Sequence, residues 1–133
     1  MTRQREFRQR YFTGTEWEPK VGYCRAVRAG QLIFLSGSAP VADDGRTYAP
    51  GDAYAQARRC FEIIQTTLQA LGAELSDIVR TRMFVTDISQ WEAFGRAHQE
   101  VMGDFPPVTS MVEVRRLISP DMLIEIEADA VVD

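Results

Sequence analysis

Acidic residues alternate with apolar residues near the carboxyl end of the sequence. In the segment 123–130, Glu125, Glu127 and Asp129 stand at every second position, so an extended strand would place the three carboxylates on one face. A carboxylate can orient a water molecule or move a proton during hydrolysis. The segment therefore predicts either a solvated strand face or one side of a reactive cleft.

Arginines follow a similar alternation in the segment 78–86. Arg80 and Arg82 point to one side of this predicted strand, together with the apolar Phe84. The opposite side would carry Val79, Thr81, Met83 and Val85. A face that combines cations with a large apolar ring suits a partner subunit or a cleft better than open water. We expect Arg82 to form a salt bridge across the sheet rather than to enter a cleft. The candidate partners are Glu113, Glu125 and Glu127.

The other residues with potentially reactive side chains are expected to have packing roles rather than catalytic ones. His98, the only histidine, lies at helical spacing from Phe94 and Val101, so we expect it in the core rather than as a general base. Cys24 has no histidine in a supporting motif, and with Cys60 it makes too few cysteines for a disulfide framework. The sequence shows no phosphate-binding glycine loop and no metal-ligand spacing, so we expect no metal and no cofactor.

Hydrophobic periodicity and turn residues predict the elements that position these side chains. The predicted strands cover 25–28, 31–38, 78–86, 109–117 and 123–132, and the predicted helices run from Asp52 to Gly72 and from Ser89 to the pair Pro106-Pro107. Asp52 is expected to cap the first helix, and Ser89 with Glu92 forms a capping-box pattern for the second. The order ββαβαββ, with both helices on one face of a mixed sheet, predicts a two-layer α+β sandwich.

Three finer expectations concern how these elements are buried and paired. The run 32–35 is apolar throughout, so we expect this strand to be buried on both faces. The last two strands, joined by a turn around Pro120, are expected to form an antiparallel hairpin. In the second helix, Trp91 is expected on the packed face with Phe94.

The composition is that of one globular domain. The chain has 133 residues, of which 45% are hydrophobic and 26% charged. Its net charge of -4 argues against a surface that neutralises phosphates, so nucleic acid is not an expected partner. No apolar run could span a bilayer, so we expect no membrane partner. Two cysteines are too few for a disulfide framework, so we expect a cytoplasmic location.

Arginines crowd the first ten residues of the chain. They are Arg3, Arg5, Arg8 and Arg10. We interpret this segment as a solvated, frayed terminus, since Glu6 interrupts the charge run. A basic arm that binds nucleic acid and a transit signal are the alternatives.

An ordered set of short motifs covers the chain from about Val21 to its end. The motifs are Leu32-Ile33-Phe34-Leu35-Ser36-Gly37-Ser38-Ala39-Pro40, Gln56-Ala57-Arg58, Asp77-Ile78-Val79-Arg80, Met83-Phe84-Val85-Thr86-Asp87, Val112-Glu113-Val114 and Ile124-Glu125-Ile126-Glu127-Ala128. In order and spacing, this set resembles the Rid (reactive intermediate deaminase) or YjgF-type family. The resemblance implies a chorismate-mutase-like fold, and a homotrimer whose sheets close into a central β-barrel with ligand clefts between subunits. It divides the chain into a variable N-terminal arm at 1–20 and a single Rid/YjgF-like domain at 21–133.

The resemblance also implies roles for site residues. Tyr23 matches a conserved aromatic hydroxyl, Gly37 matches backbone that lines the cleft, and Glu125 matches a carboxylate that orients water. In deaminating members, an arginine in the strand after the second helix binds the carboxylate of a 2-imino acid while water attacks the imine carbon. Thr109 stands at the matching position, and a hydroxyl cannot supply the charged, forked donors of a guanidinium.

Further residues complete the expected substrate-binding set. We expect Met111, two residues beyond Thr109, to contribute to it. Arg82 stands where the family usually has a small residue, and Arg25 follows Tyr23 by two positions. Either arginine could bring a compensating guanidinium into the cleft from another strand.

Three functions remain open at this point. The favoured one is a small-molecule hydrolase that acts on an imine, enamine or related compound between subunits, although Thr109 argues against the usual 2-imino acid deaminase activity. The alternative is a non-catalytic, metabolite-binding regulatory trimer. An endoribonuclease or translation inhibitor is the third, and the acidic charge and the lack of an aromatic platform disfavour it.

Overall fold

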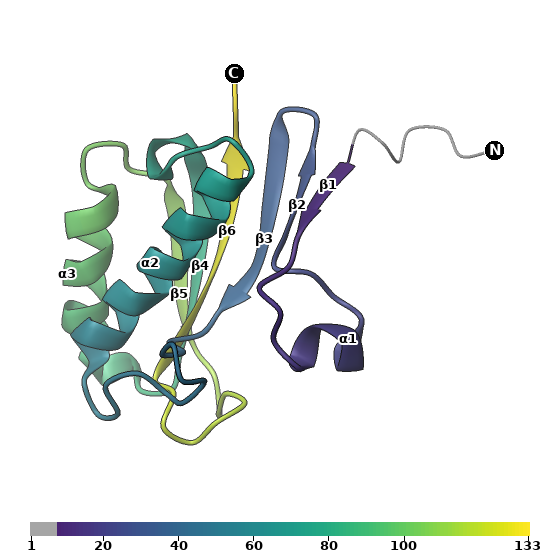
Figure 1. Ribbon diagram of the computed structural model, residues 1–133. Coiled ribbons are helices and arrows are strands. Elements are labelled where there is room, and N and C mark those ends of the chain that lie inside the picture. The colour runs from purple at the N-terminus through teal and green to yellow at the C-terminus, as the bar shows by residue number, and fades with distance from the viewer. Residues whose placement is uncertain (1–7) are drawn as a thin grey trace.

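One mixed sheet forms the framework of the molecule (Figure 1). The structure is a computed structural model that describes residues 8–133. Its six strands are β1 Arg8–Tyr11, β2 Ala26–Ala29, β3 Leu32–Ser38, β4 Ile78–Val85, β5 Val108–Glu113 and β6 Ile124–Val131. They lie in the order β1-β2-β3-β6-β4-β5, and every neighbouring pair is antiparallel except β4 and β5.

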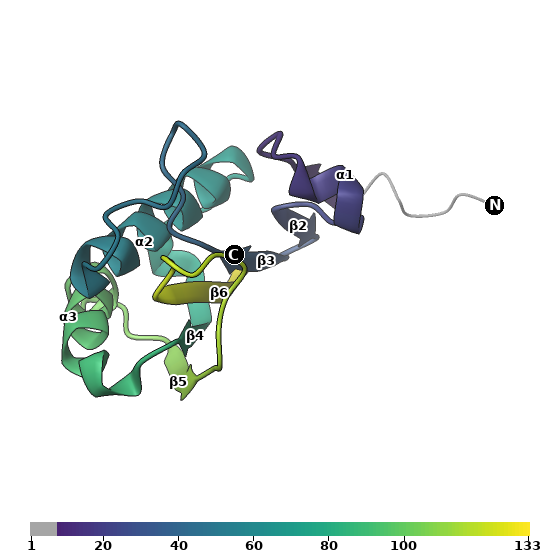
Figure 2. The same ribbon diagram turned by 90° about the horizontal axis from the view of Figure 1, so that it is seen from below.

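The two long helices cover the same face of this sheet (Figure 2). They are α2 Ala53–Ala70 and α3 Trp91–Met102; the short α1 Trp17–Val21 lies beside β1 and β2, and the 3-10 turns η2 Leu75–Asp77 and η3 Ile88–Gln90 flank β4. The predicted two-layer α+β fold is confirmed. None of the helices in the described part of the chain is long and apolar enough to cross a membrane.

Helix α2 forms where its sequence predicts it. The Asp52 carboxylate accepts a hydrogen bond of 2.9 Å from the backbone N–H of Ala55, which satisfies one of the free donors at the helix start. After the helix, Gly72 has φ of 80°, a left-handed conformation that glycine adopts without steric cost. The apolar stripe between these ends is buried and includes Phe61, Ile64 and Leu68.

Strand β6 separates the two sides of the molecule. Its even-numbered residues, Ile124, Ile126, Ala128 and Ala130, are almost fully buried under the helices. Its odd-numbered residues lie on the open face, where Glu125, Glu127 and Asp129 are partly buried and Val131 is exposed. The predicted alternation of β6 is therefore confirmed, and the sheet face that bears Glu125, Glu127 and Asp129 has no covering layer within the described chain.

The prediction of an antiparallel hairpin from the last two strands is wrong. Strand β5 pairs with β4 in parallel, and β6 lies between β3 and β4. A parallel pair needs a long crossover, which α3 supplies between β4 and β5. Turn residues around Pro120 mark a reversal of the chain, but they carry no information about which strand becomes the neighbour.

Two predictions of strand burial are also wrong. Leu32 is 45% exposed and Phe34 is 48% exposed, whereas Ile33 and Leu35 are buried. Helices cover only one face of β3, so an apolar run can be buried on one side alone. Val79 is 46% exposed because the pairing of β4 with β6 shifts between Ile78 and Arg80, which breaks the alternation there.

The second helix starts later than predicted. The Asp87 carboxylate accepts hydrogen bonds from the backbone N–H and the hydroxyl of Ser89, so Asp87 caps the 3-10 turn and no Ser89-Glu92 capping box forms. Helix α3 then begins at Trp91, which is 57% exposed instead of packed. Phe94 occupies the core as expected.

The arginine-rich start is more ordered than the sequence indicates. Arg8 and Arg10 lie in β1, which pairs with β2 at the edge of the sheet, so the expectation of a frayed terminus fails for these two residues. Their side chains are exposed, as expected. Arg3 and Arg5 lie outside the described residues.

Candidate functional site

A cleft of about 540 Å³ lies where the N-terminal segment meets the ends of β3 and β6. Its polar side chains include Tyr23, Arg25, Ser36, Arg59 and Glu125, and its apolar lining includes Trp17, Val21, Ile63, Ile118 and Met122. The pairing of β3 with β6 is irregular between Leu35 and Ser38, which turns the backbone around Gly37 toward this cleft. A cleft with an apolar lining and few polar groups is typical of small-molecule sites.

Gly37 allows the Glu125 carboxylate to lie against the backbone of β3. A Cβ atom on residue 37 would lie 2.7 Å from Cδ of Glu125 and closer still to its Oε2. Any larger residue at position 37 would therefore push the carboxylate away. The glycine is needed here for close approach.

The Glu125 carboxyl group is partly buried in the cleft. This burial raises the pKa of Glu125, the positive charge of Arg25 lowers it in part, and the negative charge of Glu127 raises it. The pKa of Glu125 lies above its ordinary value as a result. Within the described chain Glu125 forms no salt bridge, so its carboxyl group is available to a water molecule or a ligand.

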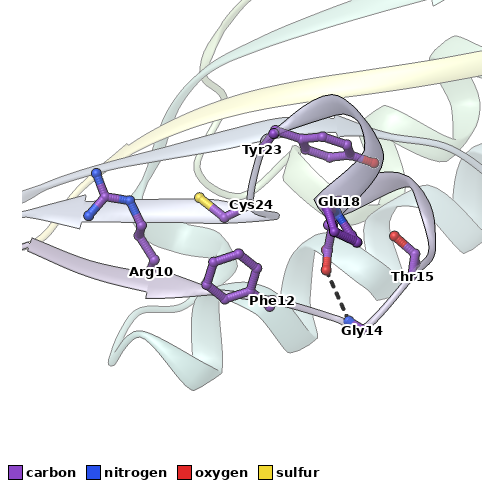
Figure 3. A pocket seen from close by; sticks show the side chains of 9 residues that line it. Arg10, Phe12, Gly14, Thr15, Glu18, Tyr23 and Cys24 are labelled. Carbon is purple, nitrogen blue, oxygen red and sulfur yellow. Dashed lines mark hydrogen bonds between the residues drawn. The ribbon is translucent and has the colours of Figure 1, made fainter.

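Glu18 holds the segment that closes one side of the cleft. Glu18 is 3% exposed, and its carboxylate accepts hydrogen bonds from the backbone N–H and the hydroxyl of Thr13. It also accepts one from the backbone N–H of Gly14, which Figure 3 shows. Burial opposes ionisation of Glu18, but these hydrogen bonds and the charge of Arg25 lower its pKa below the ordinary value. The ionised Glu18 thus ties the loop before α1 to the helix itself.

A second pocket of about 570 Å³ lies on the other side of this loop. Figure 3 shows its lining from β1, α1 and the residues that follow α1, including Arg10, Phe12 and Cys24. Thr15 and Tyr23 line both cavities. The Tyr23 ring therefore stands between the second pocket and the cleft that contains Glu125.

The comparisons with known proteins agree with one another. The model of the family described as Endoribonuclease L-PSP matches residues 13–132. The chain belongs to this family, also called the YjgF or Rid family. A 2-iminobutanoate/2-iminopropanoate deaminase of Escherichia coli is 36% identical over 116 residues, which cover 82% of this chain and 86% of that protein.

Two further relatives extend the match over nearly the whole chain. A RutC family protein of Pyrococcus abyssi is 34% identical over 118 residues, with 87% of this chain and 92% of the relative covered. A crystal structure of a YjgF/YER057c/UK114 family member from Mycobacterium tuberculosis shares 46% identity and superposes with a TM-score of 0.86. That superposition covers 94% of this chain and 99% of the other.

The structure of this Rid-family chain brings three of the expected site residues together. Tyr23, Gly37 and Glu125 all line the 540 Å³ cleft. Their roles stay predictions. Arg82 instead lies on the open sheet face, where its Nη1 is 3.6 Å from Glu127 Oε1 and 3.4 Å from Asp129 Oδ2. The expected salt bridge therefore forms, with Asp129 as an additional partner.

Thr109 and Met111 lie elsewhere within the single chain. The Thr81 hydroxyl donates a 2.7 Å hydrogen bond to the Thr109 hydroxyl, and the same Thr81 oxygen is 2.8 Å from His98 Nε2. Thr81 is fully buried under the helices, so Thr109 faces the helix layer at the β5 edge. Met111 packs beside the same core. Neither residue lines the cleft of its own subunit.

His98 has a packing role, as the sequence indicated. Its ring contacts Phe61 edge-on with centroids 5.6 Å apart. Burial lowers the pKa of His98, which favours the neutral ring. Cys24 and Cys60 are free thiols, and the desolvation of the fully buried Cys60 raises its pKa well above the ordinary value.

Sequence reasoning missed Arg59 as a cleft residue. It belongs to α2, yet its guanidinium reaches Val41 O at 2.8 Å, Asp43 at 3.3 Å and Glu62 at 3.3 Å. These contacts hold the loop after β3 against the helix. The alternation of apolar and charged residues in α2 gave no signal for such a contact, because the loop that Arg59 binds has no periodic pattern.

Proposed function

We propose that this Rid/YjgF-family protein hydrolyses a small imine or enamine in the cleft, with Glu125 as the residue that orients and deprotonates water. The observation that carries this proposal is a partly buried carboxyl group without a salt bridge, with a raised pKa, at the wall of a cleft that Tyr23 also lines. A base with a pKa nearer neutrality transfers protons in both directions more readily than an ordinary carboxylate. The deaminase name of the Escherichia coli relative supports the reaction class.

The proposed reaction uses one water molecule and no other reactant. The water oxygen attacks the imine carbon, Glu125 accepts a proton from the water, and the electron pair of the C=N bond moves to nitrogen. Glu125 then returns the proton to that nitrogen. The product of these steps is a carbinolamine, and Glu125 transfers its hydroxyl proton to the nitrogen. The C–N bond then breaks as the carbonyl forms, and ammonia leaves. Tyr23, whose ring lies beside the cleft, is proposed to hold the substrate.

Glu125→Gln tests this proposal directly. The variant keeps the size of the side chain but cannot accept a proton, so we expect kcat/KM on enzymatically generated imines to fall by about 10²- to 10⁴-fold. Glu92→Gln, an exposed site on α3, is the matched control and should leave the rate unchanged. If the wild-type protein accelerates no imine or enamine hydrolysis above the rate in buffer, the catalytic proposal is wrong.

We also propose that the working unit is a homotrimer. The open sheet face presents exposed apolar side chains such as Phe34 and Val112 next to the ion pairs of Arg82, a mixture that suits a subunit interface. Closure of three sheets into a barrel would cover this face. It would also allow the β5 edge of a neighbouring subunit, with Thr109 and Met111, to complete the cleft.

A non-catalytic binding function is the second candidate. It is favoured by Thr109, whose hydroxyl is already bonded to Thr81 and carries no charge to hold a substrate. A thermal-shift screen against metabolites separates the two functions when combined with the imine assay, because a ligand that binds only the native state raises its stability. A stabilising metabolite in a protein without imine hydrolysis would favour the regulatory role.

A further inference from the structure

Arg25 lies in the cleft and contacts both Gly37 and Tyr23. It follows α1 and precedes β2, and its backbone N–H donates a 2.8 Å hydrogen bond to Tyr11 O. Its Nη1 donates a 2.9 Å hydrogen bond to Gly37 O, and its guanidinium carbon lies 5.7 Å from the centre of the Tyr23 ring. The Glu125 carboxylate lies against the same glycine. Arg25, from the segment before β2, and Glu125, from β6, therefore meet at Gly37.

The guanidinium of Arg25 has unused hydrogen-bond donors. An arginine has five N–H groups, and only Nη1 has an acceptor within the described chain. Nε is buried and has no partner there. The guanidinium therefore keeps hydrogen-bonding capacity that the described chain does not use.

Two other arginines, Arg59 in the cleft and Arg82 on the open sheet face, are already paired. Arg59 forms salt bridges with Asp43 and Glu62, and Arg82 forms them with Glu127 and Asp129. Among residues 8–133, Arg25 has no carboxylate within salt-bridge distance, although it lines the cleft with Glu125. Its positive charge is therefore the one in this cleft that an incoming anion can neutralise.

We propose that Arg25 is the anion-binding residue of the cleft, and that it holds a carboxylate of the ligand through guanidinium donors that Gly37 O does not use, on the same subunit that supplies Glu125. A carboxylate fits because its two oxygens match the parallel donors of a guanidinium. The reaction at a C=N bond rests on the proposed function, but the binding of the anion does not. Arg25 thus determines specificity from the β2 side of the cleft, independently of the β5 edge where Thr109 lies.

Anion binding at Arg25 has a consequence for Glu125. The free Arg25 guanidinium lowers the pKa of Glu125, so an anion that neutralises this charge lets the pKa of Glu125 rise further. A proton taken from water is then retained long enough to reach the departing nitrogen. By linkage, the anion should bind more tightly as the pH falls and Glu125 becomes protonated.

Pyruvate and pyruvamide form a matched pair of probes for this site. Both carry the same carbonyl, but only pyruvate carries a carboxylate. We expect NMR titration of the full-length wild-type protein to show pyruvate binding, with pyruvamide at least about 10-fold weaker. Arg25→Gln should weaken pyruvate binding about 10- to 100-fold, and Arg25→Lys should retain part of it as a point charge. The control Arg96→Gln removes an equal charge from the exposed side of α3 and should bind pyruvate as the wild type does.

Three results would overturn the assignment. They are equal binding of pyruvate and pyruvamide by the wild type, unchanged pyruvate binding by Arg25→Gln, and no binding of either probe by the wild type. Thermal unfolding of each variant separates loss of binding from loss of fold, and Arg25→Lys serves if Arg25→Gln does not fold. The imine assay is read separately. Pyruvate binding that depends on Arg25, in a protein that hydrolyses no imine, would refute the proposed function but support the role of Arg25. Imine hydrolysis that is unchanged in Arg25→Gln would support the proposed function but refute the role of Arg25.

Discussion

Polar side chains on the helix side of the sheet and at the cleft differ in how completely they are hydrogen-bonded. On the helix side, the buried Gln56 donates to Asp121 O at 2.9 Å and accepts from the Leu123 backbone at 2.8 Å. Thr81, also buried there, is bonded to both His98 and Thr109. The buried hydroxyl of Ser38, opposite Ile126, is the exception on this side, since it has no hydrogen-bond partner within the described chain. At the cleft on the open side, Glu125 forms no salt bridge and Nε of Arg25 lacks an acceptor within the described chain.

This difference separates stabilising polar groups from reactive ones. A buried polar group whose hydrogen bonds are complete adds specificity to the core and has nothing left for a ligand. A partly buried group whose bonds are incomplete lowers stability slightly and is ready to bind. The single strand β6 contributes to both sides, because its even residues pack in the core and its odd residues face the cleft and the open sheet surface.

Neighbouring substitutions on β6 should show the largest contrast between the two sides. Ile126→Ala leaves a cavity in the fully buried core and should lower the free energy of unfolding by about 2–5 kcal/mol. Glu127→Ala removes a partly exposed ion pair with Arg82 and should cost about 0–1 kcal/mol. Urea unfolding monitored by circular dichroism measures both. Equal losses would mean that the open face is as tightly packed as the core.

An added charge on the open face should dissociate the proposed trimer without unfolding the subunit. Phe84 lies on this face, and Phe84→Glu would place an unpaired charge in the interface. Light scattering should show wild-type particles of about three times the 15.1 kDa chain mass and monomers or aggregates for the variant. Trp91→Glu, exposed on the helix side, is the control and should stay trimeric. A wild-type monomer at micromolar concentration would contradict the assembly.

The sequence predicted which residues face each side of the sheet better than it predicted which residues line the cleft. The burial of Ile124 and Ile126 and the cap at Asp52 follow from local periodicity and local hydrogen bonds, which sequence spacing records. The place of β6 between β3 and β4 depends on pairing over long sequence distances, which spacing does not record. The position of Arg25 depends on the irregular pairing near Gly37 and on the loop held by Glu18, so only the folded chain shows that this arginine lines the cleft beside Gly37.

The two sides should also respond to pH in opposite directions, and His98 reports on the helix side. Its pKa is lowered in the folded state, so the unfolded chain binds the proton more readily. The stability that neutral His98 contributes is present above the unfolded pKa of about 6.5 and is lost as the pH falls below it. When the pH is lowered from about 7 to about 5, we expect the melting temperature of His98→Gln to fall less than that of the wild type. An identical pH profile for the two proteins would contradict the buried, neutral state of His98.

The titration of Glu125 should change the stability least, and its pH dependence should be opposite to that of His98. Its pKa is raised in the folded state, so the folded chain binds the proton more readily than the unfolded chain does. The contribution of Glu125 to stability is therefore fully present below the ordinary pKa of 4.5 and is lost as the pH rises through the folded pKa, because the ionised carboxylate is poorly solvated in the cleft. Glu125→Gln stays neutral at every pH and should gain stability over the wild type near neutral pH, with the gain shrinking toward zero in acid. Melting curves of the two proteins from pH 4 to pH 8 measure this difference. A variant less stable than the wild type at neutral pH would show that Glu125 stabilises the fold in its ionised form. Glu125 would then be a stabilising polar group like those under the helices, and it would no longer distinguish the cleft from the helix side.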